Sequence, residues 1–206
     1  MKYVSSRNKN EIVESHNAII QGLATDGGLF TPESIDIHIN VDELINLSYQ
    51  QIATKVFHAF LDDFTEEEIS SSVNQAYDNK FDTEEIVPLH KIEDAYLMEV
   101  YHGPTSAFKD IALTLLPHLL IQSYNKENRH DTISILTATS GDTGKAALSG
   151  FADVKHTAIT VFYPEVGVSQ VQKKQMQTST GDNVEVIAVK GNFDDCQRMV
   201  KEATQD

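Results

Sequence analysis

The sequence predicts an α/β fold in which a mainly helical N-terminal part precedes part of a parallel, doubly wound sheet. Up to about residue 90, apolar residues recur with a helical period. After Pro88, short β-rich runs alternate with segments of helical character. That alternation is typical of parallel strands joined by right-handed helical crossovers. The change of pattern near residues 80–95 predicts two subdomains, residues 1–90 and residues 91–206.

Three helices are expected in residues 1–90. Side chains share one helical face in the first two of them: Ile12, His16, Ile19, Ile20 and Leu23 in the first, and Ile52, Val56 and Phe60 in the second. Thr65 and Glu68 have the spacing of a capping box, in which each side chain satisfies a free backbone N–H, so a third helix should begin there. Between the first two helices, the glycine-rich residues 22–30 predict a tight ordered loop before Pro32.

Four β-rich runs are expected to form the parallel sheet: residues 96–101, 132–139, 157–163 and 184–189. The helix after the first run, residues 107–124, contains Pro117, which removes an interior hydrogen bond and should kink or divide that helix. The last segment is expected to be a helix with Asp194 and Asp195 in its first turn, where carboxylates favour the helix dipole.

Composition and charge exclude several classes of function. Acidic residues outnumber basic ones by 31 to 16, the formal net charge is −15, and no basic cluster is present, so a nucleic-acid partner is not expected. Backbone N–H groups and a few cations can still bind an anionic substrate locally. The single cysteine, Cys196, excludes an intrachain disulfide. With no apolar signal core and no stretch near the roughly 20 apolar residues of a membrane span, the sequence predicts a cytoplasmic protein.

A first candidate site lies in residues 102–110, His-Gly-Pro-Thr-Ser-Ala-Phe-Lys-Asp, between a predicted strand and a predicted helix. Open α/β sheets bind ligands at this kind of position. Lys109 should lie near the positive end of a helix dipole and beside the apolar Ala107 and Phe108, which both disfavour the ammonium form. A neutral amine can form a Schiff base. From these residues alone, a solvated surface lysine is the alternative.

A second candidate site is the turn of residues 137–145, Thr-Ala-Thr-Ser-Gly-Asp-Thr-Gly-Lys, which leads into a helix rich in small residues. Such a turn can bind an anion through backbone N–H groups. An ATPase or GTPase is not favoured, because Thr139 stands where a Walker loop has its first glycine and Ala146 where it has a magnesium-binding hydroxyl. The alternative is an ordinary strand-to-helix turn capped by Asp142 or Thr143.

Residues 102–110 resemble the cofactor-lysine motif of threonine synthases, in the pattern His-Gly-Pro-Thr-x-Ala-Phe-Lys-Asp. Three further segments are similar to the same family: residues 22–30, the turn of residues 139–144, and residues 169–176, which read Ser-x-x-Gln-x-x-Gln-Met. Their order and spacing agree with the family over the whole chain. Residues 3–8 depart slightly, since they read Tyr-Val-Ser-Ser-Arg-Asn where the family more often has Ser-Thr-Arg-Gly.

The resemblance implies an enzyme of fold type II that depends on pyridoxal 5′-phosphate (PLP) and needs no metal. Its reaction converts O-phospho-L-homoserine and water to L-threonine and phosphate. By resemblance, Lys109 forms the Schiff base with PLP and later moves protons. The resemblance places Asp142 at the 3′-oxygen of the cofactor. It places four residues around the carboxylate end of the substrate: Ser140, Gly141, Thr143 and Gly144.

Family members continue well beyond this length and carry a later loop for the cofactor phosphate and a group for the pyridine nitrogen. No such loop follows Gly144, so the 206 residues are expected to be an N-terminal fragment with an incomplete active site. Two alternatives stay open. One is another fold-type-II PLP enzyme, such as an amino-acid dehydratase or a cysteine-synthase-like enzyme, and the other is a non-catalytic anion-binding module. No pattern in the sequence specifies an oligomeric state.

Overall fold

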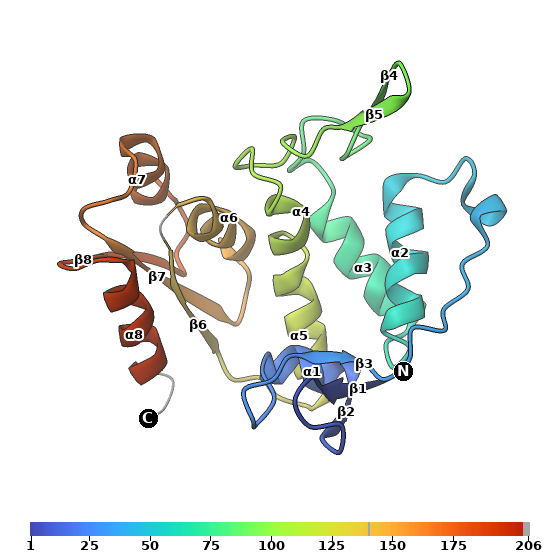
Figure 1. Ribbon diagram of the computed structural model, residues 1–206, viewed down its shortest axis with the longest axis horizontal. Helices are drawn as coiled ribbons and strands as arrows, with labels where there is room; N and C mark the ends of the chain where they lie inside the picture. The colour runs from blue at the N-terminus through green and yellow to red at the C-terminus, as the bar shows by residue number, and fades with distance from the viewer. Residues whose placement is uncertain (140, 204–206) are drawn as a thin grey trace. The chain divides into compact units, whose positions relative to one another are not determined.

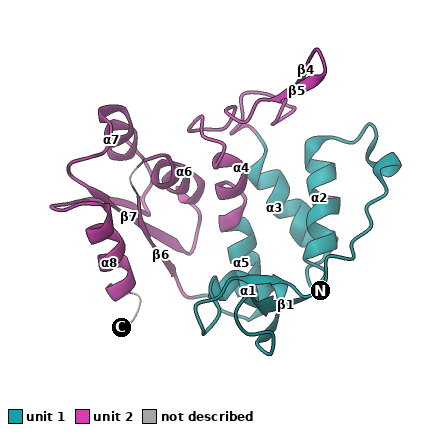
Figure 2. Cartoon of the chain, viewed as in Figure 1, with its two compact units in different colours: residues 1–78, 118–130 teal, residues 79–117, 131–206 magenta. Residues whose placement is uncertain are grey.

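The computed structural model of the chain describes residues 1–139 and 141–203 (Figure 1). These residues form two compact units, coloured separately in Figure 2. Unit 1 comprises Met1–Asp78 and His118–His130, and unit 2 comprises Asn79–Pro117 and the described residues from Asp131 onward. The chain therefore passes from unit 1 to unit 2, returns to unit 1 for residues 118–130, and ends in unit 2.

Unit 1 contains a small antiparallel sheet of order β2-β1-β3, formed by β1 (Lys2–Ser5), β2 (Ile12–Glu14) and β3 (Phe30–Pro32). Helix α1 (Ser15–Gln21) follows β2 directly. The first predicted helix is thus shorter than its sequence pattern. Ile12 lies in β2 and is 50% exposed, and Leu23 lies beyond α1 and is 56% exposed. Antiparallel pairing of β2 with β1, in the register Val4↔Ile12, removes Ile12 from the helix.

The other helices of unit 1 agree with the prediction more closely. A short 3-10 helix, η1 (Val41–Leu44), precedes α2 (Tyr49–Phe60) and α3 (Glu66–Ala76). The predicted capping box of α3 is confirmed, because Thr65 and Glu68 each accept the other's backbone N–H. Helix α2 packs against α3, and Ile69, Val73 and Ala76 of α3 are fully buried.

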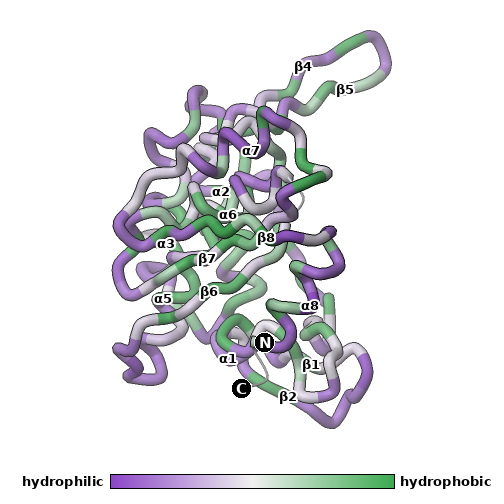
Figure 3. Tube along the Cα trace, turned by 90° about the vertical axis from the view of Figure 1, so that its left-hand side faces the viewer, coloured by the Kyte–Doolittle hydropathy of each residue, from purple (hydrophilic) through white to green (hydrophobic). Residues whose placement is uncertain are grey.

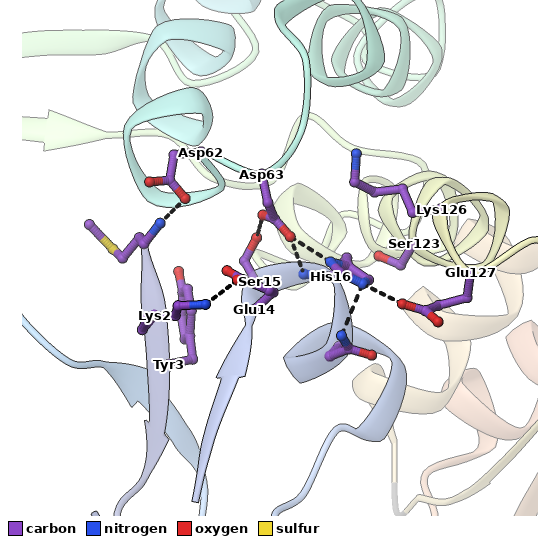
Figure 4. Close-up of polar contacts among 12 residues, drawn as sticks. Lys2, Tyr3, Glu14, Ser15, His16, Asp62, Asp63, Ser123, Lys126 and Glu127 are labelled. Carbon is purple, nitrogen blue, oxygen red and sulfur yellow. Dashed lines mark hydrogen bonds and ion pairs between the residues drawn. The ribbon is translucent and has the colours of Figure 1, made fainter.

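At the start of α1, His16 lies between two carboxylates (Figure 4). Its Nδ1 is 2.6 Å from Oδ2 of Asp63, which follows α2, and its Nε2 is 2.6 Å from Oε1 of Glu127, at the end of α5 (Leu116–Lys126). Burial lowers the pKa of His16, but the hydrogen bonds to Asp63 and Glu127 outweigh it and raise the pKa overall. The protonated imidazole therefore ties α1 to two other parts of unit 1.

Unit 2 begins with an antiparallel hairpin of β4 (Leu89–Ile92) and β5 (Ala95–Met98). Its parallel sheet has the order β6-β7-β8, formed by β6 (Ile133–Ala138), β7 (Thr157–Pro164) and β8 (Val184–Val189). Three of the four predicted strands therefore lie in the parallel sheet. The expectation for residues 96–101 was wrong, because β5 starts directly after a two-residue turn and pairs with its neighbour β4 instead.

Helices follow each strand of the parallel sheet: α6 (Asp142–Phe151), α7 (Gln170–Gln177) and α8 (Phe193–Ala203). Helix α6 packs on β7, and α8 packs on β6 and β7. Alternate residues of β7 are buried, among them Ile159 and Val161, and the chain along β6 and β7 is largely apolar (Figure 3). Helices with a parallel sheet confirm the predicted α/β class.

The predicted helix of residues 107–124 is divided, as the position of Pro117 predicted. Its first part is α4 (Asp110–Leu113), and its second part is α5, with Pro117 in the first turn. Within the described residues, no helix is long and apolar enough to span a membrane.

Candidate active site

The loop before α4 is closed by one buried carboxylate. Asp110 is only 1% exposed, and its two oxygens accept the backbone N–H of Thr105 at 2.8 Å and the Thr105 hydroxyl at 2.6 Å. A Cβ at Gly103 would lie 2.5 Å from Cβ of Asp110, so a larger residue at 103 would collide with this carboxylate. The loop of residues 103–110 is therefore folded tightly around Asp110.

Lys109 occupies the N-cap position of α4 and is half-buried. Its Nζ lies 4.3 Å from the ring centroid of Phe108, which is 61% exposed. Among the described residues, Lys109 forms no ion pair and no side-chain hydrogen bond. Its helix-start position and its contact with Phe108 are those that the sequence predicts, and its amine is available to a ligand.

His102, at the start of the same loop, is held by two carboxylates. Its Nδ1 contacts Oδ1 of Asp82 at 2.5 Å, and its Nε2 contacts Oε2 of Glu99 at 2.7 Å. Tyr101 stacks on the imidazole with 4.6 Å between ring centroids. The hydrogen bonds to Glu99 and Asp82 raise the pKa of His102. These contacts fix the chain that leads into the lysine loop.

The turn between β6 and α6 is organised by Thr139, which is 3% exposed. Its Oγ1 accepts the backbone N–H of Gly141 at 3.1 Å and that of Gly144 at 3.0 Å, and donates to the Gly141 carbonyl at 3.2 Å. The N–H groups of the two glycines are therefore directed inward. Thr139, rather than Asp142 or Thr143, supplies the side-chain cap of α6.

Asp142 and Thr143 are the first two residues of α6, and both are exposed. Their N–H groups have no intrahelical acceptor and lie at the positive end of the helix dipole. Oδ1 of Asp142 accepts the amide Nε2 of Gln172 at 2.7 Å. Ser140 lies outside the described residues.

Helices α4 and α6 pack directly against each other in unit 2 (Figure 1). A Cβ at Gly150 of α6 would lie 2.0 Å from the carbonyl oxygen of Leu113, so the end of α6 touches the end of α4. Burial lowers the pKa of Lys145, in the first half of α6, and the negative charge of Asp110, at the start of α4, acts in the opposite sense. Helices α4 and α6, which carry the two candidate segments at their N-terminal ends, are therefore packing neighbours in unit 2.

Sequence reasoning missed three features of this site. The central role of Thr139 and the contact of Gln172 with Asp142 were not predicted, although both residues belong to segments that resemble the family. The carboxylate of Asp110 was not predicted to close the lysine loop. A buried polar residue beside a glycine-containing turn is the signal that indicates such roles.

An apolar cavity of about 540 Å³ lies within unit 1, where Phe30, Phe57 and Phe60 contribute to its wall. Within the described part of the chain, no group of His, Cys, Asp or Glu side chains could hold a metal ion.

Comparison with known proteins identifies the class. Residues 2–77 match the family model described as threonine synthase N terminus, and residues 82–206 match that of pyridoxal-phosphate dependent enzymes. The chain therefore belongs to the pyridoxal-phosphate dependent enzymes. Within that family, its similarity to threonine synthases extends over the whole chain, which confirms the resemblance seen in the motifs.

The threonine synthase of Pseudomonas aeruginosa is 36% identical over 211 residues, which cover 100% of this chain and 44% of that protein. The threonine synthase of Saccharomyces cerevisiae is 34% identical, with 97% of this chain and 42% of that protein covered. The PLP-bound threonine synthase structure from Brucella melitensis superimposes with a TM-score of 0.92 at 34% identity, over 100% of this chain and 45% of that chain. The chain thus spans less than half the length of these relatives.

The residues of the site fit PLP, which brings an aldehyde, a phenolic 3′-oxygen and anionic charge. A primary amine without an ionic partner is present in Lys109. The second oxygen of Asp142, the Thr143 hydroxyl and the first N–H groups of α6 are polar groups without a protein partner among the described residues. Lys109 could therefore hold the cofactor, and the start of α6 offers polar groups that could contact it.

Proposed function

We propose that these 206 residues belong to a cytoplasmic threonine synthase, which converts O-phospho-L-homoserine and water to L-threonine and phosphate. The observation that carries the proposal is the amine of Lys109, which has no ionic or hydrogen-bonding partner among the described residues and lies at the start of α4, a helix that packs against α6. Whole-chain similarity to threonine synthases supports the choice of reaction.

When bound, PLP supplies an electron sink for carbanions at the α and β carbons of the substrate. Nζ of Lys109 would hold the cofactor and would remove and return protons at these carbons of the substrate. The carboxylate of Asp142 would contact the cofactor. The N–H groups that open α6 and the hydroxyl of Thr143, together with Ser140, bind the substrate carboxylate at the positive end of the helix.

Gly141 and Gly144 belong to the same proposed site because each lacks a side chain where the turn lies close to another side chain. A Cβ at Gly144 would lie 2.2 Å from Cγ2 of Thr139, and a Cβ at Gly141 would lie 2.5 Å from Nε2 of Gln172. Gly144 therefore needs to be glycine for Thr139 to hold the turn, whereas a Cβ at Gly141 would displace the amide end of Gln172. The turn then presents the first N–H groups of α6 outward.

Borohydride reduction tests the attachment of PLP without measuring activity. The 206-residue chain, and the longest polypeptide that contains it, are incubated with PLP, reduced, digested and mapped by mass spectrometry. We expect the label on Lys109, and its loss in Lys109→Ala but not in Lys91→Ala, which changes an exposed lysine of β4. A label on other lysines only, or no label in either polypeptide, would favour the non-catalytic anion-binding module.

Substrate assays separate threonine synthase from other PLP enzymes of this fold. Phosphate release from O-phospho-L-homoserine is compared with ammonia release from serine and from threonine. We expect turnover of O-phospho-L-homoserine by the longer polypeptide and none by the 206-residue chain, which spans 44% of the Pseudomonas relative. Turnover of serine or threonine alone would indicate a dehydratase.

A further inference from the structure

Gln172 is the third residue of α7, and the oxygen and nitrogen of its side-chain amide contact two different residues, Ser169 and Asp142. Its Oε1 accepts the hydroxyl of Ser169 at 2.9 Å, and its Nε2 donates to Oδ1 of Asp142 at 2.7 Å. An ionised carboxylate only accepts hydrogen bonds, so the NH₂ group must face Asp142. Ser169 thereby holds the amide in the orientation that Asp142 requires.

The backbone of the α6 turn leaves room for this contact. A Cβ at Gly141 would lie 2.5 Å from Nε2 of Gln172, so the amide lies directly against the Gly141 backbone. A second link joins the same two helices, because Nζ of Lys145 donates to Oγ of Ser179 at 3.1 Å, just beyond α7. Helix α7 therefore supports the start of α6 at two points.

The hydrogen bond occupies only one oxygen of Asp142. Oδ2 has no protein partner among the described residues. The amide of Gln172 is a neutral donor, so it fixes the carboxylate and leaves its negative charge in place. An ordinary exposed hydrogen bond would have little consequence beyond a small effect on stability.

We propose that Gln172 is a positioning residue of the site, which holds Asp142 so that Oδ2 faces the cofactor. The inference rests on the proposed function and deepens it, because it assigns a role to the segment of residues 169–176. Gln172 acts through Asp142 and does not itself touch the cofactor.

The variants are Gln172→Leu, which removes the amide at similar size, and Gln172→Glu, which places a second carboxylate against Asp142. The matched controls are Gln170→Leu and Gln170→Glu, which make the same changes at the exposed first residue of α7. Gln170 has no recorded side-chain partner among the described residues. Charge and helix propensity are therefore the same in each pair of variants.

A first measurement needs no cofactor. In ¹H–¹⁵N spectra of the 206-residue chain, Gln172→Leu should shift the backbone amide signals of Gly141 to Gly144, and Gln170→Leu should leave them unchanged. Equal spectra for the two variants would overturn the contact itself.

A second measurement follows PLP by its absorbance in the longest polypeptide that labels at Lys109. We expect Gln172→Leu to weaken PLP binding by about tenfold, the usual scale for loss of one hydrogen bond to a charged group. We expect Gln172→Glu to move the midpoint of the pH-dependent absorbance change by about one unit, because it adds a negative charge beside Asp142. In an Asp142→Ala background, which has no acceptor for the Gln172 amide, Gln172→Leu should have no further effect on PLP binding.

The possible failures are distinguishable. If no polypeptide labels at Lys109, the proposed function fails, and the role of Gln172 fails with it. If Lys109 labels normally but the Gln172 and Gln170 variants bind PLP alike, only the role of Gln172 is refuted. An unchanged effect of Gln172→Leu in the Asp142→Ala background would also refute it, because Gln172 would then act independently of the residue 142 side chain.

Discussion

The hydroxyl of Thr139 should be the most sensitive single group of the α6 turn. Thr139→Val keeps the shape of the side chain but removes the acceptor of two backbone N–H groups, those of Gly141 and Gly144. Both glycines are buried, so water does not replace the lost oxygen. A buried donor without an acceptor costs about 1–3 kcal/mol, and for two such donors we therefore expect the free energy of unfolding of unit 2 to fall by about 2–6 kcal/mol.

The assay is urea unfolding followed by far-UV circular dichroism. Thr139→Ser keeps the hydroxyl and loses only the methyl group that packs on Gly144, so its loss should be about 1 kcal/mol. Thr137→Val is the matched control, because Thr137 lies two residues earlier in β6 and its hydroxyl has no partner among the described residues. Equal stability of Thr139→Val and Thr137→Val would refute the role of the Thr139 hydroxyl.

Two further predictions concern the packing of α6 and the pH dependence of unit 1. Gly150→Ala should lower the stability of unit 2 by about 1–3 kcal/mol, since its Cβ would lie 2.0 Å from the carbonyl oxygen of Leu113. In an exposed helix the same change would stabilise the protein by about 1 kcal/mol. A higher free energy of unfolding in urea would therefore contradict the contact. The raised pKa of His16 adds stability that is complete below about pH 6.5 and is lost as the pH rises through the folded-state pKa. The free energy of unfolding of the wild type should decline between about pH 6 and pH 9, and that of His16→Gln should not. If the two proteins showed parallel pH profiles, the contacts of His16 with Asp63 and Glu127 would not be the source of the decline.

Local sequence signals determined much of the fold. The capping box of Thr65 and Glu68 set the start of α3. Pro117 divided the predicted helix of residues 107–124 into α4, which has Lys109 as its N-cap, and α5. Three β-rich runs separated by helical segments defined the parallel sheet. Each of these features depends on residues within a few positions of one another, so the sequence contains the whole signal.

Only the tertiary structure decided the features that depend on which strands pair with one another. Strands β1, β2 and β3 have three or four residues each and become strands because they pair with one another. That pairing takes Ile12 out of the helical pattern to which its spacing assigns it. Strand β5 likewise pairs with its neighbour β4, although its composition resembles that of the parallel strands.

The same division holds for the candidate site. The sequence by itself proposed Lys109 and the turn around Asp142 as site residues, because both occur in short segments with a family resemblance. The tertiary structure decided that α4 and α6 pack together, that Thr139 holds the turn, and that Gln172 reaches Asp142 across thirty positions of sequence. The physical reason is that a hydrogen bond or a close backbone contact depends on distances in the folded chain, which local periodicity does not encode.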